Sequence, residues 1–180
     1  ATFGARRGLY FIPGNRDFLV GAELLAEAGM VGLPDPTVLD IFGRPILLSH
    51  GDALCLDDTD YQAFRQQVRS GSWQREFLAR PLADRVALAR DMRERSESHK
   101  RGMAHAPDTW ADVDAEAARA WMEATGATTL IHGHTHRPAD HDLGQGLTRV
   151  VLSDWDAAAT PPRLEVLRLN HQGWRRISLA

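Results

Sequence analysis

The 180-residue chain is organised around one segment, Thr129-Leu130-Ile131-His132-Gly133-His134-Thr135-His136-Arg137-Pro138. Its apolar beginning predicts a β-strand, and Pro138 ends the segment because proline lacks a backbone N–H. Alternate residues of an extended backbone point to the same side, so we expect His132, His134 and His136 to face one way. Neutral imidazole is the commonest metal ligand among side chains, so the segment predicts a metal site. A turn with solvated histidines is the alternative.

Two other polar loops follow short apolar runs. Gly8 to Ile12 predicts a strand that leads into Pro13-Gly14-Asn15-Arg16-Asp17-Phe18, and Arg44 to Ser49 leads into His50-Gly51-Asp52. Open α/β sheets bind ligands at the carboxyl ends of their strands, so one sheet would bring Asn15, His50 and the histidine segment to one rim. An amide oxygen is a hard metal ligand, and the Arg16 fork matches phosphate oxygens. Taken singly, Asn15 and His50 are also explained by an ordinary turn and a hydrogen-bonded structural histidine.

Length and charge restrict the class of protein. With 180 residues, 43% of them hydrophobic, the chain suits one domain with a substantial core. A net charge of -3 and a pI near 6.2 argue against a nucleic-acid binder, which usually carries a basic face. The single Cys55 cannot form an internal disulfide, and no apolar run approaches the roughly 18 residues of a membrane span. No signal segment precedes the first strand, so we expect a cytoplasmic protein.

The remaining segments predict scaffold. Helical periodicity covers residues 19–28 and 111–124, and Gly29 and Gly126 close these helices. Short apolar or alternating runs predict β-strands, the last three of them in an antiparallel sheet. These runs are residues 37–42, 44–49, 149–152, 164–169 and 174–177.

A helical, Arg-rich region follows the second polar loop. The acidic run Asp57-Asp58-Thr59-Asp60 predicts a helix cap. From Trp73 to Arg101, arginines alternate with apolar residues. This pattern is typical of a solvated basic face, and it also suits a membrane-surface helix or a cap over a ligand with apolar and anionic parts.

The three polar loops resemble the later motifs of the calcineurin-like metallophosphoesterases, and they occur in the same order. More closely, the chain resembles the UDP-2,3-diacylglucosamine pyrophosphohydrolase family of lipid A synthesis within that superfamily. The similarity covers nearly the whole chain, and its second motif is long enough to be specific. The residues that carry it are Gly14-Asn15-Arg16-Asp17-Phe18, His50-Gly51-Asp52-Ala53-Leu54-Cys55-Leu56-Asp57-Asp58-Thr59-Asp60-Tyr61-Gln62-Ala63-Phe64-Arg65 and Ile131-His132-Gly133-His134-Thr135-His136-Arg137-Pro138.

The resemblance implies an α/β fold, a metallophosphoesterase-type β-sandwich flanked by helices. A helical lid at about 59–103 would be inserted into a single domain of residues 1–180. Two Mn²⁺ ions are implied: Asn15, His50 and His134 would bind one, and His136 the other. Arg16 and His134 would be the catalytic groups. The implied substrate-binding residues are Asn15, Arg16, Asp58, Ser96, Lys100 and His134.

Three departures from the family pattern bear on these roles. Pro13 stands where a histidine commonly precedes the first loop, and Lys100 and Met103 stand at lid positions of the family's Asn and Lys. The family's first two motifs, Asp-x-His and Gly-Asp with its bridging carboxylate, are not found in residues 1–9. We therefore expect either a fragment of a longer enzyme, poorly soluble and inactive alone, or a homologue that has lost catalysis.

The implied reaction is metal-assisted hydrolysis of the pyrophosphate bond of UDP-2,3-diacylglucosamine, which gives UMP and 2,3-diacylglucosamine 1-phosphate. Two ions would supply the hydroxide nucleophile and neutralise the developing charge. A lipid substrate implies a peripheral position on the cytoplasmic face of the inner membrane. Another calcineurin-like phosphodiesterase and a non-enzymatic metal-binding module are the rival functions, and the sequence sets no oligomeric state.

Overall fold

The computed structural model describes residues 8–103 and 112–180, without the side chains of 95–97 and 99–103. The chain divides into two compact units. Residues Ala1–Cys55 and Val113–Ala180 form the first unit, and Leu56–Asp112 form the second. The helical segment expected at about 59–103 falls within the second unit. That it acts as a lid within a single domain stays a prediction.

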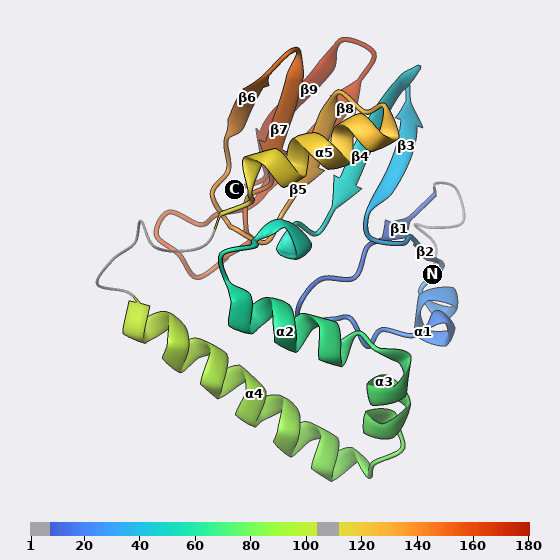
Figure 1. Cartoon of the computed structure of the whole chain (residues 1–180), viewed down its shortest axis with the longest axis vertical. Helices are drawn as coiled ribbons and strands as arrows, with labels where there is room; N and C mark the ends of the chain where they lie inside the picture. Colours follow the sequence, from blue (N-terminus) through green and yellow to red (C-terminus); the bar gives the residue numbers. More distant parts are fainter. Residues whose placement is uncertain (1–7, 104–111) are drawn as a thin grey trace. The chain divides into compact units, whose positions relative to one another are not determined.

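The first unit contains a mixed five-stranded sheet in the order β3-β4-β5-β7-β6 (Figure 1). The three central strands β4, β5 and β7 are parallel, and β3 and β6 add antiparallel edges. Every residue of β5 is buried, as expected for the centre of a sheet that is covered on both faces. The strands are β3 (Thr37–Ile41), β4 (Arg44–Ser49), β5 (Thr129–His132), β6 (Asp140–Gly144) and β7 (Leu147–Val151).

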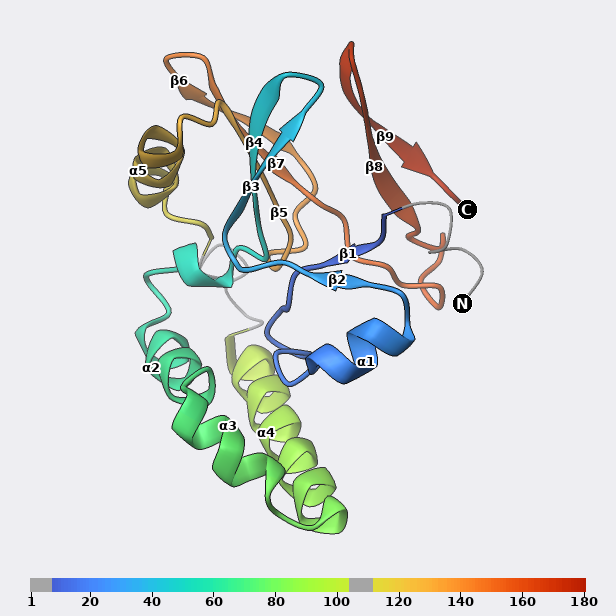
Figure 2. The same ribbon diagram turned by 90° about the vertical axis from the view of Figure 1, so that its right-hand side faces the viewer.

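A hairpin and a helix cover the two faces of this sheet. The hairpin is formed by β8 (Glu165–Asn170) and β9 (Gly173–Ser178), and the helix is α5 (Ala115–Thr125), which contacts β5 and β7. Figure 2 shows them on opposite sides of the sheet. Side chains of a strand alternate between faces, so β5 contributes to two cores. On the hairpin side the packed residues include Ile46, Ile131, Val150, Leu167, Leu169 and Trp174.

A small parallel pair precedes the main sheet in the chain. β1 (Tyr10–Phe11) pairs with β2 (Val31–Gly32), and α1 (Ala22–Glu27) connects them. Gly29 follows α1 with φ of 69°, a left-handed conformation that glycine adopts without strain. Because β1 ends at Phe11, the polar loop at 13–18 follows the carboxyl end of this strand, as the sequence predicts.

The described part of the second unit is helical, with α2 (Thr59–Val68), α3 (Gly71–Leu78) and α4 (Leu82–Met103). Asp58 accepts a hydrogen bond from the Tyr61 N–H at 3.1 Å, which confirms the predicted cap. None of the described helices combines the length and the apolar character needed to cross a membrane. A cavity of about 160 Å³ lies between α3 and α4, lined by Trp73, Glu76, Phe77, Arg80, Leu88 and Met92.

The predicted helices and strands are confirmed in position, but not all of the predicted pairing is. β7 runs parallel to β5, whereas β8 and β9 pair with each other, so the prediction of one antiparallel sheet from the last three strands is wrong. The sequence did not predict β6, because Asp140-His141-Asp142 is polar and this strand lies at a sheet edge. Cys55 is buried, as predicted.

Asp140 of β6 fastens the hairpin to the sheet. Arg176 Nη2 donates to Asp140 Oδ1 at 2.7 Å, and Trp174 Nε1 donates to Oδ2 at 2.8 Å. Burial alone would raise the pKa of Asp140, but these two hydrogen bonds and the Arg176 charge outweigh burial and lower it. A carboxylate with a lowered pKa stabilises the fold above its unfolded pKa and loses that contribution as the pH falls through the folded value.

We expect Asp140→Asn to lower the free energy of unfolding at neutral pH by about 1 kcal/mol or less, because the side chain is 43% exposed and its charge is screened. The difference should vanish at a low pH, below the lowered pKa of the folded state, where the carboxyl is protonated in both states. Urea unfolding at the two pH values measures this. Asp142→Asn is the matched control, since Asp142 accepts from the Gly144 N–H in a turn. Equal losses at both pH values for Asp140→Asn would contradict a role for the charge.

Candidate metal centre

The parallel pairing of β4 with β5 sets His50 beside the histidine segment. Ser49 lies opposite His132, so the two strands end at the same level. The Gly133 N–H then donates to the His50 carbonyl oxygen at 3.1 Å. The rings of His50 and His134 meet edge to face with their centroids 5.1 Å apart. Two imidazoles bound to one ion at about 2.1 Å lie roughly this far apart, so the pair fits a shared metal.

The loop after β1 packs directly on the His50 ring. A Cβ atom at Gly14 would lie 2.8 Å from His50 Cε1 and 2.9 Å from its Nδ1, so the ring occupies the space that a side chain would need. The Gly14 N–H donates to Asp17 Oδ1, which holds the loop in a turn. Asn15 and Arg16 lie between these two residues. Asn15 is thus one residue along the chain from the contact with His50, in keeping with a common rim.

Gly51 allows the backbone after His50 to approach β5. It has a left-handed φ of 102°, and a Cβ there would lie 2.8 Å from His132 Nδ1 and 3.3 Å from the Gly133 oxygen. His132 is fully buried, and its Nδ1 lies 2.8 Å from the Gly133 carbonyl oxygen. His132 therefore packs into the turn between the strand end and Gly51.

The three histidines of the segment do not share one side. β5 ends at His132, and His134 and His136 have left-handed φ values of 65° and 54°. The prediction that an extended backbone points all three one way is wrong, because the chain turns after the strand. A left-handed conformation is uncommon for residues other than glycine, and such strain concentrates at functional sites. The turn directs His134 to His50 and leaves the His136 side chain 61% exposed.

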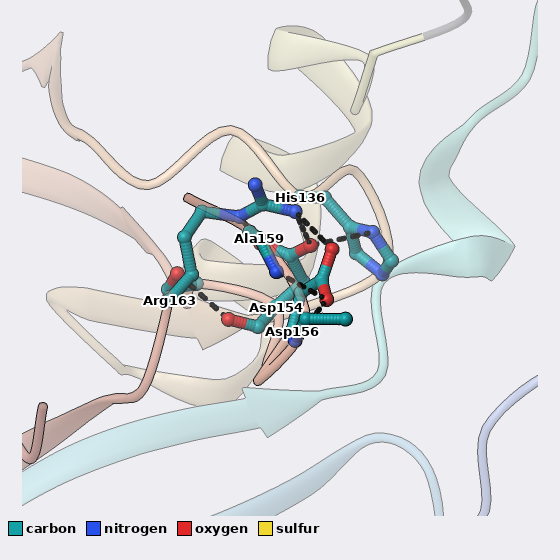
Figure 3. Close-up of polar contacts among 7 residues, drawn as sticks. His136, Asp154, Asp156, Ala159 and Arg163 are labelled. Carbon is teal, nitrogen blue, oxygen red and sulfur yellow. Dashed lines mark hydrogen bonds and ion pairs between the residues drawn. The ribbon is translucent and has the colours of Figure 1, made fainter. Parts of the chain in front are cut away.

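Asp154 and Arg163 form an ion pair beside His136 (Figure 3). Arg163 Nε donates to Asp154 Oδ1 at 3.0 Å, and its Nη2 donates to Oδ2 at 2.8 Å. Asp154 Oδ2 lies 3.9 Å from His136 Nδ1. The hydrogen bonds from Arg163 lower the pKa of Asp154 against the opposing effect of burial, so the carboxyl is ionised at neutral pH. A carboxylate in this place can orient a metal-binding imidazole.

Sequence reasoning missed Asp154, although a signal for it was present. Asp154 follows the apolar run from Arg149 to Leu152, just as Asn15 and His50 follow theirs. Backbone hydrogen bonds between Asp156 and Arg163, at 2.8 and 2.9 Å, close the loop that follows it and bring Arg163 back toward Asp154. Polar residues within a few positions of the end of an apolar run could therefore have been treated as site candidates at this strand as well.

The described residues offer some of the donor groups that a metal site would need. Among residues 8–103 and 112–180, no group of three or more His, Cys, Asp or Glu side chains is arranged to hold an ion. Asn15, His50 and His134 offer one amide oxygen and two imidazoles, a donor set that fits one divalent cation. His136 lies beside Asp154.

The predicted substrate contacts belong to both units. Arg16 follows Asn15 in the loop after β1. Asp58 caps α2, so helix capping accounts for its carboxylate. Ser96 and Lys100 lie in α4, and their side chains are outside the described residues. The substrate-binding roles of these residues stay predictions.

We expect Gly14→Ala to weaken Zn²⁺ or Mn²⁺ binding by about tenfold or more, because the new methyl group must displace the His50 ring. Calorimetric titration of the metal measures the change in the dissociation constant. Gly21→Ala is the matched control, since a Cβ at Gly21 meets nothing within 4 Å. Parental affinity in Gly14→Ala would argue that the metal does not use the His50 ring held by this contact.

Known proteins similar to the chain were found by sequence comparison. No protein-family model matches the chain. It is 44% identical to a UDP-2,3-diacylglucosamine hydrolase of Stenotrophomonas maltophilia (strain K279a), over 96% of this chain and 70% of that protein. It is 48% identical to a UDP-2,3-diacylglucosamine hydrolase of Xanthomonas campestris pv. campestris (strain 8004), over 82% of this chain and 62% of that protein. The chain thus spans 62 to 70% of the length of these two relatives.

Proposed function

The chain belongs to the UDP-2,3-diacylglucosamine hydrolase family, and from this premise we propose that the complete protein hydrolyses the pyrophosphate bond of UDP-2,3-diacylglucosamine. The products are UMP and 2,3-diacylglucosamine 1-phosphate, and the reaction is a step of lipid A synthesis. The observation that carries the proposal is the edge-to-face pair of His50 and His134 at the ends of two parallel strands. Relatives with the named activity are 44 and 48% identical to the chain over 96 and 82% of its length.

We further propose the metallophosphoesterase form of the α/β fold. The mixed sheet with a β-hairpin on one face and a helix on the other is compatible with such a sandwich. The second unit is inserted between the loop at His50 and the strand that leads to His134. This is the place in the chain where the family resemblance puts a lid, and we propose that role for α2, α3 and α4.

In the proposed site, Asn15, His50 and His134 hold one Mn²⁺ ion, and His136 contributes to a second. Bound metal supplies a hydroxide nucleophile and neutralises charge on the transferring phosphoryl group. Gly14 and the β4–β5 pairing hold the His50 ring in place, and the turn after β5 aims His134 at it. Arg16 binds the phosphate, because its planar guanidinium can donate two parallel hydrogen bonds to phosphate oxygens.

The second unit is proposed to contact the substrate away from the reacting phosphate. Asp58, Ser96 and Lys100 are the candidate contacts to the head group. Apolar Trp73 and Phe77 line the cavity between α3 and α4, together with Arg80, which is paired with Glu76. A surface with both apolar and cationic groups suits a diacylated anionic lipid, and it supports a peripheral position on the cytoplasmic face of the inner membrane.

We expect His50→Ala and His134→Ala in the complete protein to lower kcat/KM for UDP-2,3-diacylglucosamine by at least about 100-fold, since loss of groups that only support a ligand already costs about 10 to 100-fold. UMP release with saturating Mn²⁺ measures this. His171→Ala is the matched control, because His171 lies at the exposed turn of the β8–β9 hairpin. Unfolding curves confirm that each variant is folded. Activity within a few-fold of the parent would exclude the two histidines from the site.

Substrate selectivity separates the proposal from a general phosphodiesterase. We expect kcat/KM for UDP-2,3-diacylglucosamine to exceed that for bis(p-nitrophenyl) phosphate by on the order of 100-fold or more, because contacts to the remote parts of a substrate lower the barrier at the reacting bond. Chelation should abolish both activities, and added Mn²⁺ should restore them. Equal turnover of the two substrates would favour a general phosphodiesterase. Metal binding without turnover of either would favour a non-enzymatic module.

A further inference from the structure

The carboxylate of Asp35 reaches the end of β4 from the connection between β2 and β3. Its Oδ1 accepts a hydrogen bond from Ser49 Oγ at 2.7 Å and another from the His50 N–H at 3.3 Å. Ser49 Oγ in turn accepts from the Gly51 N–H at 3.0 Å. One carboxylate therefore holds three consecutive residues, Ser49, His50 and Gly51, directly or through the serine hydroxyl.

The second carboxylate oxygen of Asp35, Oδ2, lies in an energetically unfavourable environment. Asp35 Oδ2 is buried and has no hydrogen-bond partner among the residues that the structure describes. Burying a carboxylate oxygen without a partner costs free energy, so the residue is a poor choice for packing alone. What Asp35 provides is the contact of its first oxygen with the backbone of His50.

The contacts of His50 divide into two sets. Asp35 fixes its backbone N–H, and Gly133 fixes its carbonyl oxygen. Its ring lies between Gly14 and the ring of His134. The ring can keep this position only if the Cα atom of His50 stays in place, because Gly14 leaves no room for a shift toward it.

We propose that Asp35 is a positioning residue of the metal centre, which sets the His50 imidazole by holding the backbone from Ser49 to Gly51. This inference rests on the proposed function, because it takes His50 to be a metal ligand. Functional groups must be held within about 0.5 Å of their working geometry, which usually requires a supporting set of hydrogen bonds. The contact needs an acceptor oxygen and not a negative charge, since both of its donors are neutral.

The test compares three variants of the complete protein. Asp35→Ala should weaken Mn²⁺ or Zn²⁺ binding by about 10 to 100-fold and speed amide hydrogen exchange at His50 and Gly51 in the metal-free protein. Asp35→Asn retains an acceptor oxygen and should restore both properties to within a few-fold of the parent. Asp40→Ala is the matched control, because the Asp40 carboxylate accepts from the Gly43 N–H at 2.8 Å at the other end of the β3–β4 pair. It should leave metal binding and His50 exchange unchanged.

Parental metal affinity and parental exchange at His50 in Asp35→Ala would overturn the proposal, as would an equal loss of affinity in Asp40→Ala. If Asp35→Ala does not fold, Ser49→Ala replaces it: faster Gly51 exchange with weaker metal binding supports the proposal, and unchanged values refute it. A parent that binds no metal would refute the proposed function instead. In that case amide exchange in the metal-free Asp35 variants alone decides whether Asp35 holds His50.

Discussion

The pairing of β4 with β5 is the constraint on which the candidate site depends. Parallel strands need a long crossover, and here it contains the second unit and α5. Leu47 and Leu130 are opposite each other in this pair and both are fully buried. A slip of one residue would turn such side chains to the other face, so burial fixes the register. The same register brings His50 and Gly133 into hydrogen-bonding contact, and the hydrophobic core thereby sets the geometry of a polar site.

The candidate site also requires the backbone at Gly14 and Gly51 to lie very close to histidine rings. The site brings together the segments that follow β1, β4 and β5. The imidazole rings of His50, His132 and His134 fill the space between these segments. At Gly14 and Gly51 a ring nitrogen or carbon lies under 3 Å from where a Cβ would be. These glycines are therefore as necessary to the arrangement as the histidines, although they offer no ligand. This explains why glycine stands directly beside Asn15 and His50 in their motifs.

Two carboxylates support the histidines from outside the family motifs. Asp35 holds the backbone of His50, and Asp154 lies beside the His136 ring with Arg163 bound to it. They act in different ways, since Asp35 contacts a neutral N–H and Asp154 presents a charge to an imidazole. Asp35 holds the chain at His50 without contacting its ring, whereas Asp154 lies close enough to the His136 ring to orient it, as carboxylates commonly do around metal sites in proteins.

From the sequence alone, the strand-end positions of Asn15, His50 and His134 followed, as did the caps at Asp58 and Gly126. Apolar runs, turn residues and capping residues are local patterns, so they can be recognised without knowledge of the fold. The parallel direction of β7, the edge strand β6 and the burial of His132 were decided only by the tertiary structure. The tertiary structure also decided that Asp35 contacts the His50 backbone and that Asp154 lies beside the His136 ring. Each of these depends on which segment becomes a neighbour in space, and that is set by strand order and register among residues far apart in the chain, which local propensity does not encode.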